Sequence, residues 1–104
     1  TDEILDNDSA GEIPVKFKID SAYPNPFNPS VNIDILMDLT SDVNISIVDI
    51  NGRLIEKLYN GVLSTGQHSV AWTPKTSIAS GVYLIKLDIL SQGISISKEI
   101  TFLK

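Results

Sequence analysis

The segment from Tyr23 to Ser30, with the sequence YPNPFNPS, holds three prolines within six residues. Each proline fixes its own φ angle and lacks a backbone donor, and each restricts the preceding residue to extended conformations. Such a segment cannot form a helix or a central strand. We therefore expect a stiff connection that leads into the fold, with Tyr23 and Phe27 as the anchors that pack it against the core.

A two-residue hydrophobic period runs through most of the remaining chain and predicts β-strands. The sequence contains 15 Ile and 7 Val, which favour extended structure. In Val31–Leu39, apolar side chains at every second position alternate with mostly polar ones, as in a strand with one buried face. Val82–Leu90 is apolar almost throughout and predicts a central strand covered on both faces. Strands are expected over 15–19, 31–39, 43–50, 53–59, 68–72, 82–90 and 94–102.

Turn signals separate these segments. Asn51-Gly52 favours a type I′ hairpin turn, because both residues tolerate positive φ. Asn60-Gly61, Thr65-Gly66 and Ser91–Gly93 indicate further turns, and Pro74 ends the strand that precedes it. About seven short strands at this spacing predict an all-β fold, an immunoglobulin-like antiparallel β-sandwich.

Charge divides the chain into two parts. The net charge is −5, and the first twelve residues hold five acidic side chains and no basic one, so the remainder is neutral. We expect residues 1–13 to be an acidic flexible linker and residues 14–104 to be the sandwich domain. The balanced charge of the domain gives no electrostatic basis for binding nucleic acid.

Nothing in the composition indicates a membrane span or a bound cofactor. Every apolar run is far shorter than the roughly 20 residues that cross a bilayer. The absence of Cys excludes disulfides and zinc–thiolate sites, and the glycines are dispersed as turn residues. Residue 1 is not Met, so we expect a fragment or a processed piece, with any export signal upstream.

Few residues suit catalysis or metal binding. His68 is the single histidine, and because no motif accompanies it a structural position is favoured over a catalytic triad. Asp34 and Asp38 share a strand face and can act as an acid–base pair, but a solvated polar face is favoured. Asp49–Gly52 resembles the start of a calcium loop without its final Glu. Trp72 can stack on a sugar, although its phase in the strand favours burial.

Five motifs in a fixed order indicate a protein family more specifically than any of these single residues. The proline segment is followed by Asp49–Arg53 (DINGR), by Gly66–Trp72 with its GxHxVxW pattern, by Ser80–Tyr83 (SGVY) and by a final strand, Ile100–Lys104, that ends in a basic residue. Over most of the chain this order resembles the type A C-terminal sorting domain of the bacterial type IX secretion system. The Ig-like domain of flagellar hook-capping proteins is similar in the stretch from the Trp to SGVY, but it often has a longer loop there.

The resemblance implies a delivery function. Such domains lie at the C-terminus of secreted hydrolases and adhesins of Bacteroidetes-like bacteria, and the outer-membrane secretion machinery reads them. A sortase-like peptidase often removes them as the cargo is anchored at the cell surface. The resemblance therefore implies a secreted or surface-located module that is joined to an upstream cargo domain and has no catalytic residues. As candidate recognition residues we take Pro24, Asn25, Pro26, Gly81, Tyr83, Lys98 and Lys104.

Two further expectations concern the ends of the chain. The final strand, with Lys98 and Lys104, can offer an edge to which a partner adds a strand. An accessible linker before the domain suits a peptidase, so we expect cleavage within residues 1–22, near the small side chains of Ser9–Gly11.

Other functions stay open. An accessory Ig-like module that binds carbohydrate, or that spaces a catalytic domain from the surface, predicts an exposed aromatic platform. Tyr23 and Phe27 can form a binding surface instead of anchors. A small hydrolase needs a pocket that unites His68 with an acid and a nucleophile.

Overall fold

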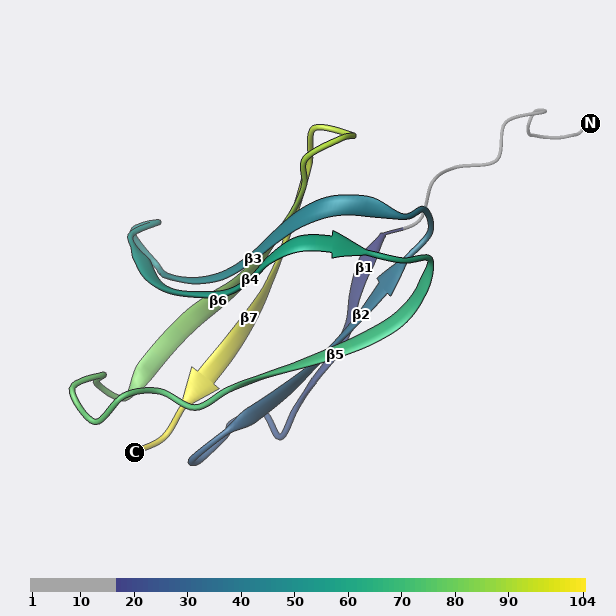
Figure 1. The fold of residues 1–104 in the computed structure, drawn as a ribbon. Helices are drawn as coiled ribbons and strands as arrows, with labels where there is room; N and C mark the ends of the chain where they lie inside the picture. Colours follow the sequence, from purple (N-terminus) through teal and green to yellow (C-terminus); the bar gives the residue numbers. More distant parts are fainter. Residues whose placement is uncertain (1–16) are drawn as a thin grey trace, which may run out of the picture.

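Residues 17–104 of the chain are described here from a computed structural model. They form seven strands and no helix: β1 (Lys18–Tyr23), β2 (Val31–Met37), β3 (Ser41–Asp49), β4 (Leu54–Leu63), β5 (Gly66–Trp72), β6 (Gly81–Ile89) and β7 (Ile94–Phe102). One sheet has the order β1-β2-β5 and the other β4-β3-β6-β7, with every neighbouring pair antiparallel. The two sheets face each other as layers (Figure 1). The all-β sandwich expected from the sequence is confirmed.

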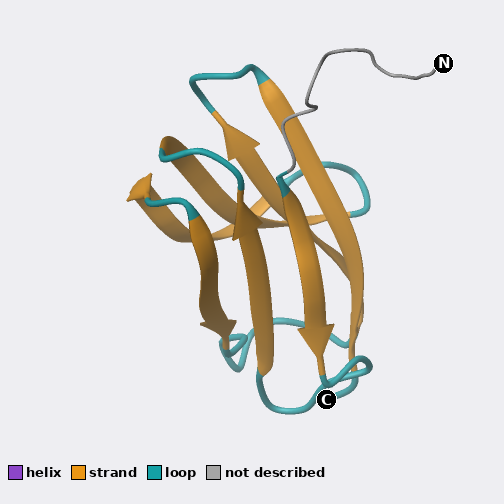
Figure 2. Cartoon of the chain, turned by 90° about the vertical axis from the view of Figure 1, so that its right-hand side faces the viewer, coloured by secondary structure: helices purple, strands orange, loops and turns teal. Residues whose placement is uncertain are grey.

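The core lies between the two sheets and consists of the alternating residues of their facing sides (Figure 2). In β2 the apolar phase predicted from the sequence is the buried phase, and in β6 every second residue from Tyr83 to Ile89 is buried. Burial of each Val, Leu, Ile or Phe side chain contributes about 1.5–3 kcal/mol to folding. The fully buried aliphatic residues include Ile33, Ile35, Met37, Ile45, Ile47, Ile85, Leu87, Ile89 and Ile100.

The first two strands differ in extent from the expectation. β1 begins at Lys18 and continues to Tyr23, so it reaches the proline segment itself. Val15 lies outside the described residues, whereas Phe17 is buried in the core. β2 ends at Met37, and Leu39 beyond it is 45% exposed, because its strand period is broken where the chain turns into β3.

The expected turn at Asn60-Gly61 is wrong, because both residues lie within β4 and pair with Asn44 and Val43 of β3. A turn does follow β4, at residues 64–65 before Gly66. Gly61 instead permits a close approach: a Cβ atom there would lie 3.2 Å from the hydroxyl oxygen of Tyr59. An Asn-Gly pair in a sequence therefore does not by itself distinguish a turn from a strand position that is too crowded for a side chain.

β6 is central in its sheet, as expected, but only one of its faces is covered. Its neighbours are β3 and β7. The residues of its outer face are only partly covered or exposed, because no layer among residues 17–104 packs on that side of the sheet. They are Val82, Leu84, Lys86 and Asp88. Val82 and Leu84 favour a strand by intrinsic propensity, so their apolar character does not show that this face is buried.

Candidate functional site

The five sequence motifs meet at one end of the sandwich, which we call the proline end. It comprises the proline loop 24–30, the hairpin loop 50–52 with Arg53, the loop 73–80 and residues 103–104. Antiparallel register brings these segments together, since Val31 pairs with Trp72 in one sheet, and Tyr83 with Asp49 in the other. The C-terminus lies at the lower end of the molecule in Figure 2, whereas Figure 1 shows the β3–β4 hairpin loop well apart from it. Motifs up to 80 residues apart in the sequence thus come to the same end of the sandwich.

Beneath this surface lies a cluster of aromatic rings. The ring of Phe27 stacks on Phe102 with centroids 5.1 Å apart and contacts Trp72 at 5.7 Å. Tyr83 meets the other side of Trp72 edge-on at 5.6 Å. Phe27 and Trp72 are each only 1% exposed. Aromatic pairs in such geometries add about 0.5–1.5 kcal/mol beyond burial, so Phe27 anchors the proline loop across both sheets.

Tyr23 does not share this role. It closes β1 and is 49% exposed, so the expectation that both aromatics of the proline segment act as anchors is wrong for Tyr23. The physical reason is strand alternation: Ala22, its neighbour in β1, takes the inward position. Phe27, in the loop, is confirmed as an anchor.

The proline loop also covers part of the β7 edge. The N–H of Phe27 donates to the carbonyl oxygen of Thr101 at 2.9 Å, and the N–H of Leu103 donates to the carbonyl oxygen of Phe27 at 3.1 Å. The side-chain amide of Asn25 continues the pattern, because its oxygen accepts the N–H of Thr101 at 3.0 Å and its Nδ2 donates to the carbonyl oxygen of Glu99 at 3.4 Å. Asn25 and Phe27 therefore pair with the edge of β7 in the way that a short additional strand would.

Lys104 and Tyr83 fix the loop 73–80 through hydrogen bonds. Lys104 Nζ donates to the carbonyl oxygens of Thr76 at 2.6 Å and Ile78 at 3.2 Å, and its backbone N–H donates to Ser80 Oγ at 2.8 Å. The hydroxyl of Tyr83 donates to the carbonyl oxygen of Ala79 at 2.6 Å. Backbone carbonyls along one face of this loop are thus occupied by the chain itself.

A further contact ties two loops of the proline end together. Ser30 Oγ lies 2.6 Å from Thr73 Oγ1, which joins the end of the proline loop to the start of the loop 73–80. Nothing in the sequence near either hydroxyl indicates this bond, because it depends on the pairing of β2 with β5. The same holds for the hydrogen bond from Trp72 Nε1 to Glu56 Oε1, at 3.2 Å.

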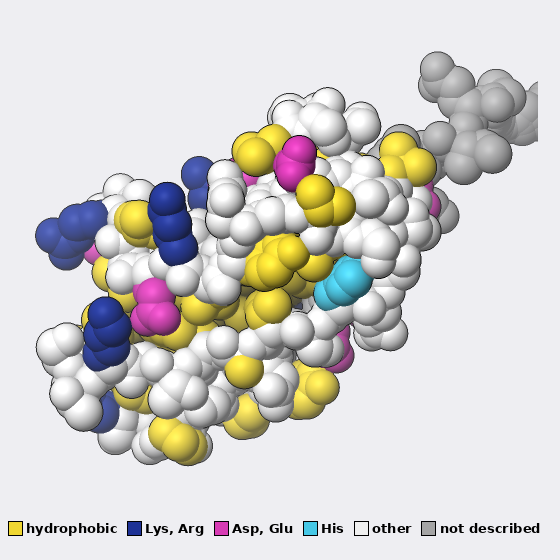
Figure 3. All heavy atoms as spheres, in the orientation of Figure 1, with side chains coloured by type: hydrophobic (Ala, Val, Ile, Leu, Met, Phe, Trp, Pro, Cys, Tyr) yellow, Lys and Arg dark blue, Asp and Glu magenta, His cyan; other side chains and the backbone are white. Residues whose placement is uncertain are grey.

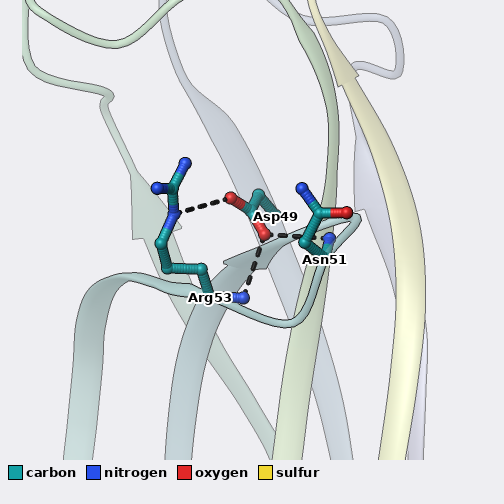
Figure 4. A network of polar contacts seen from close by, with 3 residues as sticks. All are labelled: Asp49, Asn51 and Arg53. Carbon is teal, nitrogen blue, oxygen red and sulfur yellow. Dashed lines mark hydrogen bonds and ion pairs between the residues drawn. The ribbon is translucent and has the colours of Figure 1, made fainter.

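The motif Asp49–Arg53 closes the β3–β4 hairpin through the carboxylate of Asp49 (Figure 4). Asp49 Oδ1 accepts the N–H groups of Asn51 and Arg53, both at 2.9 Å, and Oδ2 accepts Arg53 Nε at 3.1 Å. These interactions, foremost the backbone N–H of Arg53, lower the pKa of the Asp49 carboxyl below its usual value. Both carboxylate oxygens are occupied within the turn, which leaves them poorly placed for a calcium ion.

The turn itself differs from the type I′ expectation by one residue. The N–H of Gly52 donates to the carbonyl oxygen of Asp49 at 2.9 Å, so Ile50 and Asn51 are the central residues and Gly52 is the fourth. Gly52 has φ of 82°. An Asp at the first position, with a left-handed Gly after the turn, is typical of a three-residue hairpin loop with a bulge.

Acid should weaken this hairpin. The pKa of Asp49 is lower in the folded than in the unfolded chain, so its contribution to stability is present above the unfolded value and is lost as pH falls through the folded value. We expect Asp49→Asn to lower the melting temperature at neutral pH and to reduce the loss of stability between about pH 4 and pH 2. Melting curves over this range check it. The exposed Asp42 of the same strand provides the control, and an equal effect of Asp42→Asn would contradict the assignment.

Of the candidate recognition residues, six belong to the proline end or border it, and Lys98 does not. Pro24, Asn25 and Pro26 lie in the proline loop, Gly81 and Tyr83 begin β6, and Lys104 is held by the loop 73–80. Lys98 lies midway along β7 opposite Ile85, in phase with the inward-facing residues of that strand.

The residues considered for catalysis are not brought together. His68 Nε2 donates to the carbonyl oxygen of Ser64 at 2.7 Å. Asp34 accepts hydrogen bonds from Ser21 and Ser69 at 3.2 and 2.6 Å, across three neighbouring strands. Among residues 17–104 no group of three or more His, Cys, Asp or Glu side chains is placed to hold a metal ion. The described residues also contain no helix capable of crossing a membrane.

Comparison with known proteins gives two matches. Residues 21–101 match the model of a family described as the secretion system C-terminal sorting domain. The crystal structure of dimeric latent PorU from Porphyromonas gingivalis contains a similar fold, with a TM-score of 0.67 and 21% identity over 91% of this chain and 10% of that chain. At this identity the likeness shows the fold alone, and the chain spans about a tenth of PorU. None of the curated proteins matches significantly.

The family match covers the proline segment and all the motifs that follow it except the last residues of β7 and beyond. It therefore spans most of the β-sandwich and almost all of the elements that build the proline end. Domains of this family are signals for type IX secretion to the cell surface. The chain belongs to the family of secretion system C-terminal sorting domains.

Proposed function

We propose that the type IX machinery of the outer membrane reads the proline end when it exports the cargo that carries this domain. The observation that carries the proposal is that the separate motifs of the sequence reach the same end of the sandwich. The surface is rigid, because Phe27 is buried beneath it and Asn25, Tyr83 and Lys104 fix its loops through hydrogen bonds. A preformed surface loses little conformational freedom when it binds a receptor.

Five of the candidate recognition residues then divide into two groups. Pro24, Pro26 and Asn25 offer exposed atoms to a receptor. Tyr83 is buried and Lys104 is bonded to loop carbonyls, so these two shape the surface from within. Lys98, away from the proline end, supplies a separate charged contact on β7.

Delivery of a reporter tests this proposal. We expect a reporter with an export signal, fused upstream of this chain and expressed in a bacterium with type IX secretion, to reach the cell surface. Pro24→Ala and Lys104→Met should reduce surface display severalfold, whereas Lys57→Met, an exposed lysine on β4, should not. Melting curves of the purified variants separate recognition from unfolding. Normal delivery of both proline-end variants would count against the proposal.

We also propose that a sortase-like peptidase removes the domain and that the cargo is then anchored at the surface. Because β1 is paired with β2 from Lys18 onward, cleavage inside residues 18–22 would require the strand to unpair. The expected bond therefore lies before Lys18; the candidate site Ser9–Gly11 lies outside the described residues. Mass spectrometry of the released domain measures its first residue, and a first residue after Lys18 would disprove this assignment.

The domain itself acts as a signal without catalysis in this proposal. The carbohydrate-binding alternative is weakened, since Trp72, its principal aromatic candidate, is buried and hydrogen-bonded to Glu56. The hydrolase alternative requires His68 beside an acid and a nucleophile, and His68 is instead bonded to the turn before β5.

A further inference from the structure

The sandwich has four outer strand edges, because β1 and β5 border one sheet and β4 and β7 border the other. An unpaired edge exposes a row of N–H and C=O groups that can pair with another chain. Proteins commonly block such edges with charges, prolines, bulges or a covering segment. The four edges of this domain differ sharply in these features.

β1 is blocked, and β7 is blocked over part of its length. β1 carries an ion pair between Lys18 and Asp20 at 3.3 Å, and its register with β2 shifts between Ile19 and Ser21. The C-terminal part of β7 is covered by the proline loop, as described above. The remaining part of β7 carries Lys98, but its first four residues hold no charge or proline and pair with β6 in an unbroken register.

β4 is blocked as well. Its pairing with β3 shifts register twice, between Ile45 and Ser46 and between Ile47 and Val48. It also carries Glu56 and Lys57 in its first half. Bulges twist an edge away from a flat pairing geometry, and charges resist burial beside a second strand.

β5 has none of these features. Its seven residues, GQHSVAW, include no Lys, Arg, Asp, Glu or Pro. Its register with β2 is unbroken from Gly66 to Trp72, and no other strand among residues 17–104 pairs with it. By the rules that protect natural edges, β5 is the one of the four that is open to pairing along its whole length.

An apolar seam runs beside this edge. Where β4 and β5 border the two sheets, their side chains Ile55, Leu58, Tyr59 and Val70 pack against the core but stay partly exposed. Figure 3 shows hydrophobic side chains in the furrow between the sheets on this side. Whatever pairs with β5 would cover part of this seam as well, and burial of apolar area adds to the backbone hydrogen bonds.

We propose that β5 pairs antiparallel with β5 of a second copy of this chain, so that two copies form a continuous six-stranded sheet. Centred on Ser69, the two-fold axis places Gln67 opposite Ala71 and His68 opposite Val70. No like charges meet in this register, because the strand carries no Lys, Arg, Asp or Glu.

The second copy is favoured as occupant over a single extended peptide because it covers more of the seam. A two-fold axis at β5 also brings β4 of the partner toward β4 of the first copy, so each seam faces the other. A lone peptide strand would cover β5 and leave the apolar side chains of β4 exposed. The proposal is independent of secretion, since the surface lies along the side of the sandwich and not at its proline end.

Charge swapping on β5 tests the pairing. Gln67 and Ala71 are exposed, so paired Lys or paired Glu substitutions there should leave the fold intact, which circular dichroism checks. We expect the unaltered chain to form dimers in sedimentation equilibrium. The variants Gln67→Lys/Ala71→Lys and Gln67→Glu/Ala71→Glu should each associate about tenfold more weakly, because like charges then lie opposite one another. An equimolar mixture of the two should recover dimerisation.

A matched variant on another edge separates this surface from general effects of charge. Ser95→Lys/Ser97→Lys places two lysines on exposed positions of β7 and should leave association unchanged. Three outcomes would each overturn the proposal: a chain that stays monomeric at millimolar concentration, loss of dimers on changing β7, or β5 variants that associate as tightly as the parent and fail to prefer each other.

Discussion

Replacement of Phe27 by alanine should lower the free energy of unfolding by about 3–5 kcal/mol. The side chain is fully buried and contacts the rings of Trp72 and Phe102, which belong to different sheets. Truncation leaves a cavity between them that the stiff proline loop cannot close, because its φ angles are fixed. Urea unfolding followed by far-UV circular dichroism measures the change, in this variant and in those of Trp72.

The neighbouring aromatic supplies the control. Tyr23 is half exposed at the end of β1, so Tyr23→Ala should change the free energy of unfolding by only about 0.5 kcal/mol. Similar losses in the free energy of unfolding for Phe27→Ala and Tyr23→Ala would contradict the view that Phe27, and not Tyr23, anchors the loop.

Phe27→Ala has a local consequence that distinguishes release of the proline loop from general destabilisation. The N–H groups of Thr101 and Leu103 donate to Asn25 and Phe27 of the proline loop. If Phe27→Ala releases this loop, the two amides should lose protection from hydrogen exchange more than the amides that pair β7 with β6. Uniform loss of protection along β7 would instead indicate a weaker fold with the loop still in place.

The strands could be predicted from the sequence because their signal is local. Alternation in Val31–Met37 or in Ile94–Phe102 reports directly which side chains face the core. The sequence-based predictions were wrong where one residue type occurs in two different structural settings. Gly61 allows the approach of the Tyr59 ring within a strand, and Val82 and Leu84 suit an uncovered strand face.

The proline end was only partly predictable. Its motifs could be identified one by one, but the sequence does not show that Asn25 pairs with the backbone of β7 or that Lys104 reaches the carbonyl of Thr76. These contacts join residues more than 20 positions apart, and they follow from the sheet order, which alternation does not determine. The motifs therefore describe a folded surface more than a linear signal, and changes to buried members such as Tyr83 should act through its shape.

Trp72→Ala should be as damaging as Phe27→Ala, at about 3–5 kcal/mol. The indole is buried between Phe27 and Tyr83, and its Nε1 donates to Glu56 Oε1 at 3.2 Å. Trp72→Phe keeps a ring and removes the donor, while Glu56→Gln keeps an acceptor. We expect Glu56→Gln to cost less than about 1 kcal/mol, which isolates the ring contacts as the main contribution.

A double-mutant cycle between Phe27 and Trp72 then measures how the proline loop is linked to the β1-β2-β5 sheet. The two rings are in direct contact, so the loss in the double alanine variant should be smaller than the sum of the single losses, by about 0.5–1.5 kcal/mol. The pair Phe27 and Ile45 provides the comparison, with Ile45→Val as a mild change in the opposite sheet. A coupling near zero for Phe27 and Trp72 would mean that Phe102 and the β7 edge alone hold the loop. Because Trp72 precedes the loop 73–80 and Phe27 lies in the proline loop, a measured coupling would show that these two loops of the proline end are stabilised together.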